Sequence, residues 1–308
     1  MDIQEIAAHW GKLSRQPRLV RDRENAIYEV HLSSGLHAAL RVHRAGYQSA
    51  EAIKAELDWT AALAEGGFPC PRPVASLDGS FVHQTAAGRS VSVVTWIEAD
   101  PIGANGTPFT GPLELYEKAA ALMARLHEMS NALKLPQLDR PSWASDALLG
   151  ETPHWGRFWE NPALTPDNVQ LLQTARKNAA QHLSVRNDPV RLIHADLLQE
   201  NILQNQTGLW IIDFDDSGYG YEGYDLGTLL IQHAESDRLE ALCGAVLKGY
   251  AAQRGSVTLH MHDLQLFIML RSMASCGWIM SRASESDPRQ AFYAGRAVRC
   301  ATRYLDNM

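Results

Sequence analysis

Residues 191–227 read RLIHADLLQENILQNQTGLWIIDFDDSGYGYEGYDLG, and they combine short apolar runs with closely spaced polar residues. One short apolar run ends at His194, and two more occupy residues 202–203 and 209–212. The residues between them, 205–208, are Asn-Gln-Thr-Gly, which favour a turn. Two apolar runs separated by turn residues predict a β-hairpin.

The predicted hairpin brings polar side chains together at its open end. Pairing of Leu203 with Trp210 would place Asn201 beside Asp213. Amide and carboxylate oxygens are ligands that Mg²⁺ takes in proteins, alongside water and phosphate. Asp196 lies just before this pair and is left to accept a proton. The stretch therefore predicts a magnesium site beside a general base.

Three motifs in this stretch resemble the catalytic core of the kinase-like phosphotransferases. His-Ala-Asp-Leu-Leu-Gln-Glu-Asn at 194–201 keeps the spacing of the protein-kinase loop H-R-D-x-x-x-x-N, with alanine at its second position. Asp-Phe-Asp at 213–215 resembles D-F-G. Tyr-Asp-Leu-Gly at 224–227 resembles the Tyr-Asp-Leu-Ala element of the aminoglycoside phosphotransferase, choline kinase and homoserine kinase type II family. The alternative is a polar loop between strands whose acidic residues are solvated.

The resemblance implies an α+β fold of the protein-kinase-like, two-lobe type. Residues 1–98 would form a small N-terminal nucleotide-binding lobe with an antiparallel sheet and one helix. Residues 99–308 would form a larger, mostly helical lobe that carries catalysis and substrate binding. The change to a segment rich in helix breakers near residue 98 supports this boundary.

The resemblance also assigns roles to the residues of the motifs. Asp196 would orient the acceptor hydroxyl and accept its proton. Asn201 and Asp213 would hold Mg²⁺ against the phosphates of ATP. His194 and Asp225 would support the catalytic loop.

The N-terminal third alternates between strand and helix patterns. Ser49 is a plausible N-cap for a helix over residues 50–65, which Gly66 would end. Residues 53, 57, 60 and 63 recur at helical spacing on its buried side. Period-two alternation and turn residues predict strands at 26–32, 38–42, 81–84 and 90–97.

The parts that would bind ATP depart from the family pattern in two places. Arg41 occupies the position of the lysine in the V-A-I-K strand, and Glu56 on the buried side of the helix is its expected partner. An arginine still forks onto a carboxylate or phosphates, but with a different geometry from lysine. The segment 19–28 occupies the place of the glycine-rich loop and contains no glycine. A surface Arg41 and a helix-flank Glu56 are the alternative.

Residues 93–98, Val-Val-Thr-Trp-Ile-Glu, resemble the hinge between the lobes, where backbone groups would meet adenine. This resemblance assigns Trp96 and Glu98 to the nucleotide site. A plain strand followed by a loop is the alternative.

The C-terminal two thirds are predicted to be mainly helical. His127, near the end of the first of these helices, is expected to be a structural core histidine. The aromatic residues Trp143 and 154–159 would either pack an insertion onto the large lobe or form a cage for a quaternary ammonium group. Helices are predicted at 113–129, 167–183, 228–235, 238–253, 262–282 and 287–307.

Composition narrows the class of protein. With 308 residues, 45% of them hydrophobic, the chain is long enough to bury one large core or two modest ones. Its net charge of −7 disfavours a general nucleic-acid binder. The four cysteines are scattered without a paired motif, which favours reduced thiols in a cytoplasmic protein. No apolar run approaches the length of a membrane span, and no signal peptide is expected.

The sequence therefore predicts a cytoplasmic, ATP-dependent and Mg²⁺-dependent kinase. Its acceptor would be a small hydroxylated molecule that bears an amine, such as homoserine, an amino alcohol or an aminoglycoside. The alternatives are a protein Ser/Thr kinase of the stress-response type and a pseudokinase that binds nucleotide without turning it over.

Overall fold

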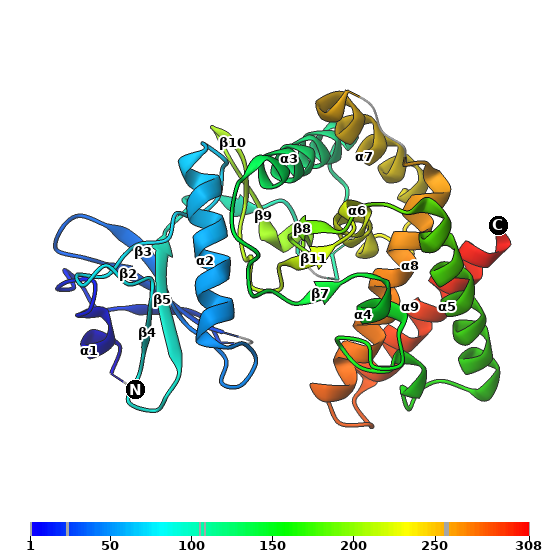
Figure 1. Cartoon of the computed structure of the whole chain (residues 1–308), viewed down its shortest axis with the longest axis horizontal. Helices are drawn as coiled ribbons and strands as arrows, with labels where there is room; N and C mark the ends of the chain where they lie inside the picture. Colours follow the sequence, from blue (N-terminus) through cyan, green and yellow to red (C-terminus); the bar gives the residue numbers. More distant parts are fainter. Residues whose placement is uncertain (1, 23–24, 105, 108, 256–258, 308) are drawn as a thin grey trace. The chain divides into compact units, whose positions relative to one another are not determined.

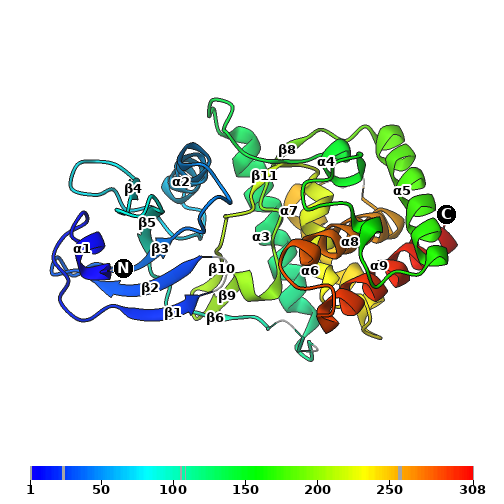
Figure 2. The same ribbon diagram turned by 90° about the horizontal axis from the view of Figure 1, so that it is seen from below.

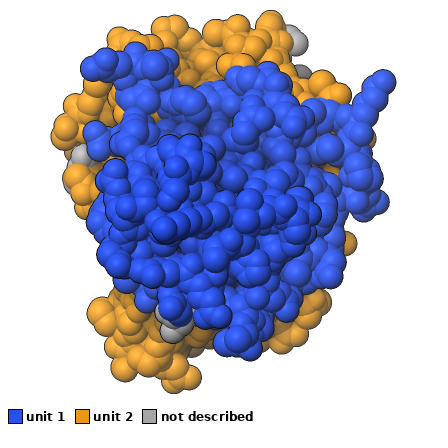
Figure 3. Space-filling view, turned by 90° about the vertical axis from the view of Figure 1, so that its left-hand side faces the viewer, with its two compact units in different colours: residues 1–100, 133–140, 205–215 blue, residues 101–132, 141–204, 216–308 orange. Residues whose placement is uncertain are grey.

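The computed structural model describes residues 2–22, 25–104, 106–107, 109–255 and 259–307. The chain divides into two compact units, which Figure 3 colours separately. Unit 1 comprises residues 1–100, 133–140 and 205–215. Unit 2 comprises residues 101–132, 141–204 and 216–308. The domain boundary near residue 98 stays a prediction.

Unit 1 is built on a five-stranded antiparallel sheet of order β1-β2-β3-β5-β4 (Figure 1). Four of its strands were predicted, and β1 was not, because its side chains are all exposed and carry no hydrophobic pattern. The predicted segment 19–28 forms part of β1 and β2, with Arg23 and Glu24 outside the described residues. The strands are β1 (Arg18–Asp22), β2 (Ala26–His31), β3 (His37–Val42), β4 (Val82–Gln84) and β5 (Ser90–Thr95).

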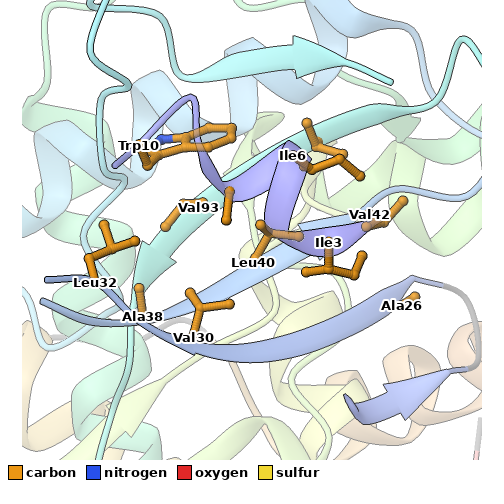
Figure 4. Close-up of a cluster of buried hydrophobic side chains, with 12 residues drawn as sticks. Ile3, Ile6, Trp10, Ala26, Val30, Leu32, Ala38, Leu40, Val42 and Val93 are labelled. Carbon is orange, nitrogen blue, oxygen red and sulfur yellow. The ribbon is translucent and has the colours of Figure 1, made fainter. Parts of the chain in front are cut away.

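The two faces of this sheet carry different side chains, because neighbouring residues of a strand point to opposite sides. Leu40 and Val42 of β3 pack against the short helix α1 (Ile3–Ala7) and Trp10 in one hydrophobic core (Figure 4). Ala39 lies on the opposite face, in a second cluster with residues of helix α2. Arg41, two residues further along β3, is therefore directed to the α2 side of the sheet.

Helix α2 (Ala50–Glu65) has the predicted bounds. Ser49 caps it, since its hydroxyl accepts a hydrogen bond from the amide of Ala52 at 3.0 Å, and Gly66 follows its last turn. Its buried side carries the four predicted residues and also Glu56, a carboxylate in an otherwise apolar stripe: Ile53, Glu56, Leu57, Thr60 and Leu63. A buried carboxylate requires a partner.

Two small sheets accompany the helices. One has the order β10-β9-β6, and both strands of the predicted hairpin belong to it: β6 (Asp100–Pro101), β9 (Ile202–Asn205) and β10 (Gly208–Ile211). The other lies within unit 2 and has the order β7-β11-β8, from β7 (Ser142–Trp143), β8 (Arg191–Ile193) and β11 (Gly218–Gly220). Strand β8 leads directly into the catalytic-loop motif.

Unit 2 is otherwise helical, as expected. Helices α3 and α7 pack together, and α8 packs against both α6 and α9 (Figure 2). Its helices are α3 (Leu113–Ala132), α4 (Ser145–Leu149), α5 (Pro166–Arg186), α6 (Glu222–Ile231), α7 (Leu239–Arg254), α8 (Met261–Trp278) and α9 (Pro288–Asp306). In the part of the chain described, no helix is both long enough and apolar enough to cross a membrane.

Helix α6 begins earlier than predicted. We expected a helix from residue 228, but α6 starts at Glu222 and includes the whole Tyr-Asp-Leu-Gly motif. Gly227 explains the tight packing of α6 against α8, because a Cβ there would lie only 2.5 Å from the backbone carbon of Phe267. The Tyr-Asp-Leu-Gly motif is therefore helical and packs closely against α8, with Asp225 directed to the catalytic loop.

Candidate active site

The catalytic loop, residues 194–196, is held by the carboxylate of Asp225. Its Oδ1 accepts the amide of Ala195 at 2.6 Å, and its Oδ2 accepts the amide of His194 at 2.9 Å. Ala195 has a φ of 66°, in the left-handed region that a residue with a Cβ seldom occupies. Two charge-assisted hydrogen bonds to consecutive amides keep the loop in this unfavourable conformation.

Asp225 is itself fixed by a buried polar chain. His127 contacts Asp225 Oδ2 through Nε2 at 3.0 Å and the hydroxyl of Tyr250 through Nδ1 at 2.8 Å. All three side chains are buried. Burial raises the pKa of Tyr250 above its ordinary value, so its hydroxyl keeps its proton. His127 is thus a core histidine, as predicted, and it acts by supporting Asp225.

The predicted base, Asp196, is paired with an arginine that the sequence did not reveal. Arg271 of α8 donates from Nη2 to Asp196 Oδ1 at 2.6 Å. Burial works against the charge of Arg271, but Asp196, Tyr224 and Asp216 together raise the pKa of Arg271 above its ordinary value. The side chain of Asp196 remains 20% exposed, so a reactant still has access to its carboxylate.

Asn201 is oriented by the same aspartate. Its side-chain nitrogen donates to the backbone carbonyl of Asp196 at 2.8 Å and to its Oδ2 at 3.1 Å. The amide nitrogen is therefore occupied, which leaves the amide oxygen for another partner. An oxygen that is held in place without a charge suits a hard cation such as Mg²⁺.

The second predicted metal ligand, Asp213, belongs to unit 1. It has a φ of 65°, another left-handed residue with a Cβ. Its carboxylate adds to the raised pKa of Arg41, so it lies in the electrostatic environment of that guanidinium. A carboxylate and an amide oxygen form a donor set that fits Mg²⁺. Because Asn201 lies in unit 2, the joint coordination by the two residues stays a prediction.

Arg41 and Glu56 form the predicted ion pair, and both are buried. Arg41 Nη1 lies 2.6 Å from Glu56 Oε1, and Arg41 Nη2 lies 3.3 Å from Glu56 Oε2. Burial alone would raise the pKa of Glu56, but the guanidinium holds it below its usual range. Burial likewise opposes the charge of Arg41, whose pKa is raised by its carboxylate neighbours. The role of this pair toward nucleotide stays a prediction.

Asp215 is not a solvated acid, which the alternative interpretation of this stretch as a polar loop would require. It is buried, and its Oδ1 lies 3.3 Å from Arg41 Nη2. The third residue of the Asp-Phe-Asp motif is therefore a second carboxylate on the arginine. The guanidinium of Arg41 stabilises both carboxylates, Glu56 and Asp215, which would otherwise repel each other.

Two further residues that sequence reasoning missed fix the backbone of this motif. Arg140 donates to the carbonyls of Phe214 and Asp215, and also to the side chain of Gln48 at 2.7 Å. Gln48 in turn donates to the carbonyl of Asp215. Arg140 follows a Pro-containing loop with no periodic pattern, so the sequence carried no signal for this role.

Trp96 and Glu98, assigned to the nucleotide site, are brought together by His37. The rings of His37 and Trp96 stack with centroids 5.2 Å apart. His37 Nδ1 lies 3.0 Å from Glu98 Oε1, and His37 Nε2 lies 2.9 Å from Glu29 Oε1. Both ring nitrogens therefore face carboxylates. The contact of Trp96 and Glu98 with adenine stays a prediction.

The aromatic segment is packed as an insertion onto unit 2, the first of its two interpretations. Trp143 and Phe158 are fully buried, and Trp143 stacks on Tyr224 with centroids 5.5 Å apart. The face of Trp155 is covered by Arg271, whose guanidinium carbon lies 4.8 Å from the ring centroid. A protein cation thus occupies the position that a quaternary ammonium group would take on this ring.

Comparisons with known proteins agree with this arrangement. The model of the phosphotransferase enzyme family matches residues 16–260. The amicoumacin kinase of Bacillus subtilis is 24% identical over 232 residues, which cover 74% of this chain and 66% of that protein. The homoserine kinase of Chelativorans sp. is 26% identical over 284 residues, which cover 88% of this chain and 80% of that protein.

Solved structures share the fold over the whole chain. A microcompartment-associated aminopropanol kinase is 29% identical with a TM-score of 0.86, and the match covers 99% of this chain and 97% of that one. The amicoumacin kinase hAmiN, solved in complex with AMP-PNP, Ca²⁺ and Ami, has a TM-score of 0.76 at 20% identity, covering 99% of this chain and 92% of that one. The fold is therefore the predicted protein-kinase-like one. The chain belongs to the phosphotransferase enzyme family and is a kinase of small molecules.

Proposed function

We propose that this protein is a cytoplasmic kinase that transfers the γ-phosphoryl group of ATP to a hydroxyl of a small, amine-bearing alcohol. One observation carries the proposal: Asp196 is held by Arg271 and Asn201 on a loop whose backbone Asp225 fixes. The four cysteines are buried and free, in keeping with a reducing compartment.

Asp196 positions the acceptor and takes its proton. The acceptor oxygen forms a bond to the γ-phosphorus, the bond from that phosphorus to the bridging oxygen of ADP breaks, and the hydroxyl proton passes to the carboxylate. With Arg271 on one of its oxygens, Asp196 is a weak base and accepts the proton late. Its contribution is mainly orientation, as phosphoryl transfer requires.

The other predicted residues act on the nucleotide. Asn201 and Asp213 would hold Mg²⁺, which neutralises charge on the phosphates when it is bound. Arg41, kept in place by Glu56 and Asp215, supplies a fixed cation to the phosphates. Trp96 and Glu98 would border the adenine. Arg41 occupies the position where lysine is usual in the family. Its two carboxylate partners support a role in balancing the negative charge of the phosphates.

The amine in the proposed acceptor is supported by relatives. Homoserine and aminopropanol, which name two of the similar kinases, each carry a hydroxyl and an amine. The short segment between Asp213 and α6 leaves little chain for an activation segment, so the small molecule is favoured over a protein acceptor.

A panel of amino alcohols, hydroxy amino acids and aminoglycosides, assayed for ADP release with Mg²⁺, tests the proposal. We expect the wild type to phosphorylate at least one of these compounds and the Asp196→Ala protein to phosphorylate none of them. Phosphorylation of a protein substrate without any response to the panel would favour a protein kinase. Nucleotide binding without turnover of any acceptor would favour a pseudokinase.

A further inference from the structure

Arg271 has more hydrogen-bond donors than its surroundings satisfy. Its Nη2 donates to Asp196 and the hydroxyl of Tyr224 is a further neighbour, but its Nε and Nη1 are buried and make no hydrogen bond of standard geometry among the described residues. A guanidinium carries five N–H donors and no acceptor. Buried donors without partners are rare in folded proteins, so these donors point to a group that binds beside Asp196.

Two neighbouring aromatic residues present further donors of the same kind. Trp155, on which Arg271 stacks, has a buried Nε1 without a partner among the described residues, and the buried hydroxyl of Tyr224 has Arg271 as its neighbour, which leaves its proton to donate. Trp143 lies against both rings, with centroids 4.8 Å from Trp155 and 5.5 Å from Tyr224, and fixes their positions. Burial raises the pKa of Tyr224 to about 12, so its hydroxyl remains protonated and able to donate.

The charged groups near these donors are two guanidinium groups and two carboxylates. Arg296 of α9 is buried near Arg271, and after burial itself the charge of Arg271 contributes to lowering the pKa of Arg296. The carboxylates that act on Arg271 are Asp196, which is already hydrogen-bonded, and Asp216. A cationic group at this place would meet two guanidinium groups and a Trp155 face that is already covered.

We propose that Arg271, Trp155 and Tyr224 form a carboxylate-binding subsite beside Asp196, so that the acceptor is a hydroxy amino acid. The subsite rests on the function proposed above and adds the substrate class to it. The hydroxyl of the acceptor lies at Asp196, its carboxylate accepts hydrogen bonds from the three side chains, and its ammonium group is directed away from Arg271.

Matched pairs of acceptors that differ only in the carboxylate test this subsite. The pairs are L-serine with ethanolamine, and L-homoserine and L-threonine each with its decarboxylated analogue. For the pair that the enzyme turns over, we expect kcat/KM to favour the carboxylate by on the order of 10- to 100-fold, as for hydrogen bonds to a charged group. Arg271→Gln should bring the ratio within that pair close to one.

The ratio of kcat/KM within a pair distinguishes recognition of the carboxylate by Arg271 from support of Asp196 by Arg271. Loss of that support lowers kcat for both members of a pair equally. Arg271→Lys, which keeps the charge but has one donor group, should retain part of the preference. Arg176→Gln is the matched control, because Arg176 also stacks on a tryptophan, Trp159, and lies against Leu149 and Glu151. Circular dichroism and thermal melting establish that each variant is folded.

Several outcomes would overturn the subsite. These are equal or better turnover of the decarboxylated members by the wild type, or a ratio that Arg271→Gln leaves unchanged. Phosphorylation of aminoglycosides alone would overturn the subsite and leave the proposed function intact. If nothing is phosphorylated, the proposed function fails, and calorimetry with a non-hydrolysable ATP analogue decides the subsite: no binding of any of the three amino acids overturns it.

Discussion

Arg271 Nη2 lies 2.6 Å from Asp196 Oδ1, so the predicted base rests against a buried cation before any substrate arrives. A guanidinium at this distance stabilises the ionised carboxylate and fixes one of its oxygens. The other oxygen accepts from Asn201, which ties the base to a predicted metal ligand. Arg271 and Asn201, both in unit 2, therefore orient Asp196.

Asp196→Ala should lower kcat by about a thousandfold or more, because the variant neither orients the acceptor hydroxyl nor takes its proton. Nucleotide affinity should change little, since the residue is assigned to the acceptor. Turnover by ADP release and ATP affinity by calorimetry measure the two effects. Asp237→Ala, at an exposed aspartate of the same unit, is the control. Near-normal turnover in a folded Asp196→Ala protein would remove the assignment.

Asp213→Asn should weaken binding of Mg·ATP far more than binding of ATP without metal. The substitution removes the charge on a predicted magnesium ligand and keeps its size. Calorimetric titrations with Mg²⁺ and with a chelator distinguish the two affinities. Equal losses in both titrations would mean that Asp213 does not act on the metal.

Arg41→Lys should keep measurable activity, whereas Arg41→Met should raise the KM for ATP, lower kcat, or both. Arg41→Met should also lower the free energy of unfolding by about 3–5 kcal/mol, because it leaves buried carboxylates of Glu56 and Asp215 without their cation. Urea denaturation measures the stability. The double variant Arg41→Met/Glu56→Gln should recover part of it, and no recovery would show that the pair is not the source of the loss.

Asp225→Asn should lower both kcat and stability. An amide has one acceptor oxygen, so its NH₂ group would face the amide of His194 or Ala195, each of which donates to Asp225. We expect a loss of about 3 kcal/mol in the free energy of unfolding, typical of a broken buried charged network. Hydrogen exchange should show faster exchange of the two amides. Unchanged protection of both would contradict the role of Asp225.

His43 should make stability depend on pH in the acidic range. Burial, followed by the charge of Arg41, lowers the pKa of His43 from 6.5 to about 3, against the opposing effect of Glu56 and with smaller contributions from Arg89 and Arg140. Asp215 also faces it, with a carboxylate oxygen 3.9 Å from its Nδ1. Below its ordinary pKa the unfolded chain gains a proton that the folded chain refuses, so stability falls as the pH drops from 6.5 toward 3.

The slope from this one group should approach 1.4 kcal/mol per pH unit, as a limit on the order given by linkage. Urea denaturation at several pH values between neutrality and acid measures it. His43→Gln should flatten the dependence, and His9→Gln, at an exposed histidine, should not. An unchanged slope in the His43→Gln protein would show that the residue is protonated in the folded state.

The fold and the motif residues could be predicted because their signals are local. Ser49 and Gly66 mark the ends of α2 at the expected residues, and helical spacing selected Glu56 as the carboxylate that the family resemblance requires. Arg41 followed from its resemblance to the lysine of the V-A-I-K strand, and Glu56 from its place on the buried side of its helix. Such arguments need only the period of a helix or strand.

Arg271 and Arg140 could not be predicted, because their partners are far away in the sequence. Arg271 lies in a helix that is buried along most of its length, so no amphipathic pattern distinguishes it. Its contact with Asp196 spans 75 residues, and only the packing of α8 against α6 brings it to the loop. The burial of Asp215 could not be predicted for the same reason, since its arginine partner lies 174 residues earlier.

The two hydrogen bonds that backbone amides donate to Asp225 also set an order of events during synthesis. The catalytic loop emerges from the ribosome about thirty residues before the carboxylate that holds it. Until α6 has been made and has docked through Gly227, Ala195 has no reason to remain in the left-handed region. A nascent chain that ends before Glu222 should therefore contain every residue of the loop but lack the loop's folded backbone conformation. Catalytic competence should appear only after α6 is complete.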